Sequence, residues 1–200
     1  MPKVVPEYKE QAKKRIMEAA NSEFLKRGYR KTTMSDIAKK VGVSKGAVYQ
    51  YFESKDALIG ALGNAFVESL ISNEFSSSRK EGLIMTTEGA FERILSSMPS
   101  WFPNLMSDFL SEAHRSEDVR KQVRAIDQKL VIAISGFWEE RRKAGEVPPD
   151  VGTEGIARGL VALQLGLMAF VSTGMPRSEA IEAWTEMVRG LGRGLESKKR

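Results

Sequence analysis

Apolar residues recur every three or four positions along most of this chain, which is the spacing of one buried helix face. The spacing predicts long helices at about 8–27, 54–78, 118–144, 153–173 and 178–195. Glycine follows the first and third of these segments directly, where it commonly ends a helix. We find no segment with the alternating pattern of a strand, so the sequence predicts an all-α fold.

Residues 32–56 have the pattern of a helix-turn-helix, in which two short helices pack across a tight turn. The first helix is predicted at Ser35–Val41, and Gly42 follows it at once. The second helix is predicted at Lys45–Phe52. Val43 lies between them and is expected to be the buried residue of the turn.

Short polar side chains at the starts of these two helices suit N-caps, which accept hydrogen bonds from the first turn. Either Thr33 or Ser35 can cap the first helix, and Ser44 can cap the second. Asp36 lies in the first turn of its helix, where the helix dipole favours negative charge. These features support the positions of both helices.

The exposed positions of the second helix suit contact with DNA. Small residues at its start let the backbone approach a phosphate, and Lys45 adds positive charge there. Tyr49, Gln50 and Tyr51 supply hydroxyl, amide and aromatic groups that can contact bases and phosphates, and Lys55 follows the helix as a candidate phosphate contact. An ordinary amphipathic helix pair would carry charged residues at these positions instead.

The charge distribution agrees with a nucleic-acid-binding segment. Residues 1–60 hold 13 Lys and Arg against 7 Asp and Glu, whereas residues 61–200 hold 18 against 19. The whole basic excess of a chain with net charge +5 therefore lies around the helix-turn-helix. For each basic residue of the first helix, a solvated surface explains its position as well as a phosphate contact does.

Residues 8–65 resemble the TetR family of bacterial and archaeal transcriptional regulators. The resemblance rests on many residue types at fixed spacing: Ala19, Ala20, Phe24, Gly28, Tyr29, Thr32, Thr33, Asp36, Ile37, Ala38, Gly42, Val43, Ser44, Gly46, Tyr49, Tyr51, Phe52, Lys55 and Leu58. It implies a homodimer whose all-helical subunits have about nine helices each. Residues 8–60 would form a three-helix DNA-binding head with the helix-turn-helix at about 33–52, and residues 61–200 a larger ligand-binding and dimerisation domain.

The resemblance also implies which residues contact double-stranded operator DNA. The matching positions are Thr33, Ser44, Lys45, Gly46, Ala47, Tyr49, Tyr51 and Lys55. Gln50 occupies a position that varies within the family, so its predicted contact rests on its place in the helix alone.

The predicted helix at 153–173 is apolar on nearly all sides, because only Arg158 and Gln164 are polar between Ile156 and Val171. Such a helix is buried on nearly all sides, which suggests that it faces both its own core and a partner subunit. With the last helix it would form half of a two-fold symmetric, four-helix interface. The predicted interface residues are Leu160, Leu163, Leu167, Phe170, Trp184, Met187, Val188 and Leu191.

A membrane span is the competing interpretation of the same helix. Its uncharged part, residues 159–176, is close to the lower length limit of a span and contains Gln164 and three glycines. We therefore predict no membrane partner.

Aromatic and Met side chains near Pro99 and Pro103 are candidates for an effector pocket, since pockets are mostly apolar and Met adapts to varied shapes. For any single one of them, ordinary core packing is the simpler explanation. The pocket itself is mainly implied by the family resemblance. The candidates are Trp101, Phe102, Met106, Phe109, Phe137 and Met168.

The absence of Cys and the single His argue against a zinc site, a disulfide or thiolate chemistry, and suit the cytoplasm. The charged start of the chain does not have the apolar run of a signal peptide. We predict no enzymatic activity, cofactor or metal. The predicted function is a ligand-responsive transcriptional repressor, released from a palindromic operator by a small apolar or amphipathic effector. The alternative is a non-enzymatic helical interaction protein with a degenerate helix-turn-helix.

Overall fold

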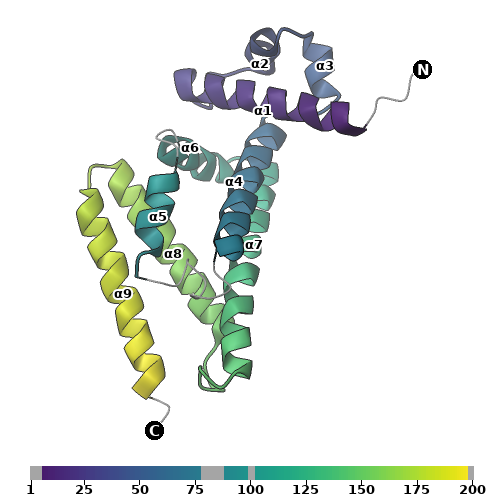
Figure 1. Cartoon of the computed structure of the whole chain (residues 1–200). Coiled ribbons are helices and arrows are strands. Elements are labelled where there is room, and N and C mark those ends of the chain that lie inside the picture. Colours follow the sequence, from purple (N-terminus) through teal and green to yellow (C-terminus); the bar gives the residue numbers. More distant parts are fainter. Residues whose placement is uncertain (1–5, 78–87, 99–101, 198–200) are drawn as a thin grey trace. The chain divides into compact units, whose positions relative to one another are not determined.

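The structure is a computed structural model that describes residues 6–77, 88–98 and 102–197. Within these residues the chain forms nine helices and no strand, which confirms the predicted all-α fold (Figure 1). The chain divides into two compact units. Unit 1 takes in residues 1–66 and 104–124, and unit 2 takes in residues 67–103 and 125–200. This division differs from the expected boundary after residue 60, because residues 104–124 group with the N-terminal part of the chain.

Three helices form the N-terminal head of unit 1. They are α1 (Pro6–Arg27), α2 (Met34–Val41) and α3 (Lys45–Tyr49). Helix α2 packs on α1, and α3 packs on α2, at the purple and blue end of the chain (Figure 1). Helix α3 ends at Tyr49, three residues before its predicted end at Phe52, because residues 50 and 51 form a turn.

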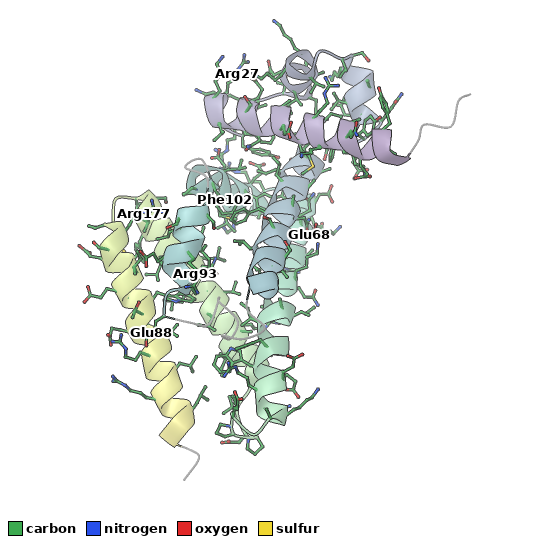
Figure 2. All side chains as sticks on the ribbon, viewed as in Figure 1. Arg27, Glu68, Glu88, Arg93, Phe102 and Arg177 are labelled. Atoms are coloured by element: carbon green, nitrogen blue, oxygen red, sulfur yellow. The ribbon has the colours of Figure 1, made fainter. Side chains whose placement is uncertain are left out.

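The start of α2 is fixed by a capping box and an ion pair. Thr33, not Ser35, is the N-cap: its hydroxyl accepts from the Asp36 backbone N–H at 3.2 Å, and the Asp36 carboxylate accepts from the Thr33 backbone N–H at 2.9 Å. Arg27, labelled in Figure 2, ion-pairs with Asp36 at 2.9 Å and with Glu23 at 3.2 Å. The last turn of α1 is thereby joined to the first turn of α2.

The predicted buried residue of the turn is exposed. Val43 is 41% exposed, so that prediction is wrong. Ile37 and Val48 are fully buried and supply the core between α2 and α3. The turn between these helices is held by its backbone, since Gly42 adopts a left-handed φ of 81° and the Val43 N–H donates to the Ala38 carbonyl.

Three more helices contribute to unit 1. Helix α4 (Lys55–Ser77) begins there and ends in unit 2, and its N-cap Ser54 accepts from the Ala57 N–H at 2.9 Å. Most of α6 (Phe102–Ala113) and the first turns of α7 (Glu117–Lys143) also belong to unit 1. The chain passes from α6 to α7 through a short turn at residues 114–116.

Unit 2 contains α5 (Ala90–Ser97), α8 (Thr153–Ser172) and α9 (Arg177–Ser197), together with the ends of α4 and α7. Helices α8 and α9 pack side by side, and α9 also packs on α5 (Figure 1). Arg177 donates to the Leu95 carbonyl at the end of α5, and Arg189 ion-pairs with Glu88 at 2.8 Å (Figure 2).

The prediction that Trp184 lies at a subunit interface is wrong. Its side chain is fully buried within the single chain, where it stacks on Phe91 with ring centroids 5.6 Å apart. The helical spacing shows that a side chain is apolar, but it does not distinguish a core contact from an intersubunit contact. Trp184 therefore stabilises the packing of α9 on α5.

The capping box predicts how the stability of the head depends on pH. Hydrogen bonds from the Thr33 side chain and backbone, with Arg27 beside them, lower the pKa of the Asp36 carboxyl. A carboxylate with a depressed pKa stabilises the folded state above its unfolded pKa, and that contribution is lost as the pH falls through the folded pKa. Asp36→Ala should therefore reduce the free energy of unfolding at neutral pH, and the difference from the native protein should shrink at about pH 3. Urea unfolding at both pH values measures this difference, and a pH-independent difference would contradict the assigned role of the carboxylate.

Candidate nucleic-acid interface

Helix α3 buries one side and exposes the other. Val48 is fully buried against the head, whereas Ser44, Lys45, Gly46, Tyr49 and Gln50 are exposed. An isolated helix of five residues would not be stable, so its conformation depends on this packing and on its cap. The polar face is therefore presented on a backbone held by the core.

Local contacts order this exposed face. The Ser44 hydroxyl accepts from the Ala47 N–H at 3.1 Å and caps the helix as predicted. The Lys45 ammonium lies 5.6 Å from the centroid of the Tyr49 ring, within the range of a cation–π contact. This pair places a positive charge and a phenol together on the exposed side of α3.

The remaining predicted DNA contacts lie in different environments. Thr33 is exposed, but its hydroxyl is engaged with Asp36 in the capping box. Ala47 and Tyr51 are half-buried. Their contacts with DNA stay predictions.

Lys55 is held by the protein itself. Its ammonium donates to the Tyr29 carbonyl at 2.8 Å and lies 4.2 Å from the centroid of the Tyr29 ring. Burial lowers the pKa of the Lys55 ammonium, and the nearby carboxylates, Asp56 first among them, oppose that shift. Sequence reasoning missed this contact because Tyr29 and Lys55 lie on opposite sides of the helix-turn-helix. A phosphate contact by Lys55 stays a prediction.

A second candidate surface lies on α8 and α9 in unit 2. An apolar groove of about 200 Å³ is lined by Ile156, Gly159, Leu160, Leu163, Met187 and Leu191. Phe170 and Met187 on the same two helices are 59% and 60% exposed. Leu160, Leu167 and Val188, predicted at the interface, are mostly buried inside the unit.

The predicted pocket residues are distributed over both units. Phe109 and Met106 belong to unit 1, and Phe102, Phe137 and Met168 belong to unit 2. Phe102, Phe109 and Met168 are buried, and Phe137 is half-buried beneath the Arg141 guanidinium at 4.7 Å. Trp101 lies outside the described residues. The effector pocket stays a prediction.

The described part of the chain offers no group of three His, Cys, Asp or Glu residues that could hold a metal ion. Its single histidine, His114, is exposed in the turn after α6.

Comparison with known proteins places the head in a family. Residues 16–62 match the family of bacterial regulatory proteins named tetR. An uncharacterised HTH-type transcriptional regulator of Bacillus subtilis strain 168, YdgC, is 26% identical over 191 residues, which cover 90% of this chain and 93% of YdgC. The HTH-type transcriptional regulator UidR of Escherichia coli K12 is 24% identical over 78% of this chain and 79% of its own.

Solved structures share the fold along most of the chain. GusR of Salmonella enterica superimposes with a TM-score of 0.76 at 21% identity, covering 96% of this chain and 100% of GusR. That likeness extends the agreement from the helix-turn-helix to the helices of unit 2. The exposed face of α3, the matched head and the shared fold lead to one conclusion: the chain is a TetR-family transcriptional regulator.

Proposed function

We propose that this regulator is a homodimeric repressor that binds a palindromic operator through α3 and is released from it by a small effector. The observation that carries the proposal is the exposed polar face of α3 beside a fully buried Val48. One such helix contacts few base pairs, so selective binding requires two heads about 34–36 Å apart in successive major grooves. The function then depends on three parts: the face of α3, a subunit interface and an effector site.

The side chains of α3 divide into two proposed roles. Lys45 and Gln50 carry the donors and the amide that read guanine and adenine edges in the major groove. Ser44 and Tyr49 carry hydroxyls that suit phosphate oxygens and fix the register on the duplex. Thr33, Gly46, Ala47, Tyr51 and Lys55 complete the proposed contact set.

The groove on α8 and α9 is the proposed subunit interface. Large apolar side chains such as Phe170 and Met187 are exposed on the single chain, and burying them against a second copy removes that apolar area from water. A two-fold axis would bring the grooves of the two subunits face to face. In this arrangement, Leu160, Leu163, Leu167, Val188 and Leu191 lie in or beneath the contact.

This interface also accounts for the composition of α8. Among the described helices, α8 alone is long and apolar enough to cross a membrane, and 33% of its apolar window is buried in the single chain. An interface with a second copy covers much of the rest without a bilayer. We accordingly propose that the protein is cytoplasmic, because its DNA partner lies in the cytoplasm.

The effector is proposed to be small and apolar or amphipathic. It releases DNA only if it binds the released conformation more tightly than the DNA-bound one. Operator DNA must then weaken effector binding by the same factor. The alternative function, a helical interaction protein with a degenerate helix-turn-helix, is disfavoured because α3 keeps both its cap and its exposed polar face.

The DNA-binding role of α3 is tested with a duplex that the native protein selects from a random-sequence library. Lys45→Ala should weaken binding by about 1–3 kcal/mol if Lys45 contacts a base. It should also relax the preference for one base pair in a repeated selection. If Lys45 contacts a phosphate instead, the slope of log affinity against log salt should fall by about one unit. Fluorescence anisotropy at several salt concentrations separates the two contacts.

Lys121→Ala is the matched control, because it removes the same charge from an exposed position on α7. It should leave the affinity for the selected duplex unchanged. Equal losses in both variants would show that only net charge matters. A native protein that selects no duplex at low salt would count against the DNA-binding function itself.

The proposed interface predicts that Met187→Glu dissociates the dimer. Met187 is already 60% exposed on the single chain, so a carboxylate there leaves the subunit core intact and must be desolvated only when two copies meet. Sedimentation velocity should show monomers for this variant. Ile132→Glu, at a 62% exposed position on α7, is the matched control and should stay dimeric. A Met187→Glu dimer would place the interface elsewhere.

A further inference from the structure

Tyr29, in the turn between α1 and α2, is a junction of hydrogen bonds within unit 1. Its side chain is 2% exposed, and each of its three polar groups has its own partner. The backbone N–H donates to Asp108 on α6 at 3.1 Å, and the carbonyl accepts from Lys55 at 2.8 Å. The phenol O–H donates to Asp56. One residue of the head is thereby bonded to both α4 and α6.

Asp56 extends this junction to α7. Its second carboxylate oxygen accepts from the Ser116 hydroxyl at 2.8 Å. Ser116 is also the residue that caps α7, because its hydroxyl accepts from the Val119 N–H at 3.3 Å. The Asp56 carboxylate therefore lies between a phenol from the head and a hydroxyl from the α6–α7 turn.

Neighbouring contacts bring the same elements together. Arg30, directly after Tyr29, donates to Ser111 on α6 at 3.2 Å and lies 3.8 Å from the Glu112 carboxylate. Further along α4, a Cβ added at Gly60 would lie 1.3 Å from the Gln122 amide oxygen, so Gln122 of α7 rests against the α4 backbone. Helix α6 and the start of α7 thus contact α4 and the head at several points.

The position of this junction in the chain gives it a consequence for DNA binding. Tyr29 precedes the helix-turn-helix and Lys55 and Asp56 follow it, so the junction holds both ends of that segment. Asp108 bonds to the first end and Ser116 to the second. Any displacement of residues 108–116 must therefore break these bonds or move both ends of the helix-turn-helix.

The groups involved are costly to leave without partners. Tyr29 is buried and Asp56 is half-buried, so a hydrogen bond lost between them leaves polar groups that water can replace only in part, at a cost in free energy. Burial and the Asp56 carboxylate raise the pKa of the Tyr29 phenol, so it remains a donor at neutral pH. The junction is therefore expected to keep its full set of bonds or to rearrange as a whole.

We propose that Asp108 and Ser116 are positioning residues for DNA binding, which hold the helix-turn-helix in its binding geometry through Tyr29 and Asp56. They lie 79 and 60 positions along the chain from their respective partners, and neither belongs to the helix-turn-helix. The proposal rests on the proposed DNA-binding function.

Three substitutions of Ser116 test the proposal against a purely local role in capping α7. Ser116→Ala removes both the cap and the bond to Asp56, and Ser116→Thr retains both. Ser116→Asp keeps a good cap but places a second carboxylate beside Asp56, where like charges repel. Ser135→Ala is the matched control, since among the described residues that hydroxyl on α7 bonds only to the Ile132 carbonyl of its own helix.

The measurements are the affinity for the duplex selected by the native protein, by fluorescence anisotropy, and the melting temperature. Ser116→Ala and Ser116→Asp should each weaken DNA binding about tenfold at temperatures well below melting. Ser116→Thr and Ser135→Ala should bind as the native protein does. Asp108→Ala should weaken binding similarly, and Asp108→Asn, which keeps an acceptor for the Tyr29 N–H, should restore most of the affinity.

Native affinity in the Ser116→Asp variant would overturn the proposal, because the cap alone would then account for Ser116. Native affinity in Asp108→Ala would do the same for Asp108. Both results presuppose that the native protein selects a duplex. If it selects none, the DNA-binding function fails first, and circular dichroism melting of the same variants still reports whether the junction stabilises the fold.

Discussion

The hydrogen bond from the Lys55 ammonium to the Tyr29 carbonyl closes the helix-turn-helix into a loop whose two ends are joined. Ile37, Val48 and the two N-caps order the inside of this segment, whereas this bond ties its two ends to each other. A five-residue helix has little stability of its own, so the orientation of α3 depends on how its flanking segments are anchored. The same carbonyl and ring that receive Lys55 belong to the residue that bonds α6. The anchoring of the segment that carries α3 and the bond to α6 therefore depend on one residue, Tyr29.

Much of this architecture follows from local sequence rules. Thr33, one of the two candidates, caps α2, Gly42 takes the expected left-handed conformation, and Ser44 caps α3. The long helices begin and end within a few residues of their predicted bounds, because periodicity and capping act over neighbouring positions. The polar face of α3 was equally predictable, since a helix that buries Val48 must expose the positions on its other side.

The features that could not be predicted all depend on contacts between distant parts of the chain. Lys55 looked like a free basic residue, and only the folded chain shows Tyr29 beside it. Trp184 has the same apolar character whether it faces Phe91 or a second subunit. Val43 has an apolar side chain like that of a core residue, yet Ile37 and Val48 form the core between the two helices and Val43 stays exposed. Residues 104–124 join unit 1 through hydrogen bonds to Tyr29, Arg30 and Asp56. The spacing of apolar residues along the sequence does not indicate such bonds between distant positions.

Two contact surfaces of the chain differ in chemistry: the junction around Tyr29 in unit 1 and the exposed face of α8 and α9 in unit 2. The junction in unit 1 consists of hydrogen bonds, which are directional. Each of them is lost when its donor and acceptor move apart by a fraction of the bond length. The face of α8 and α9 in unit 2 is apolar, and apolar burial is non-directional and proportional to the area removed from water. An apolar interface tolerates small shifts at little cost, whereas a polar junction changes between bonded and unbonded states. Under the proposed function, this division would place the tolerant contact between two subunits and the directional one beside α3.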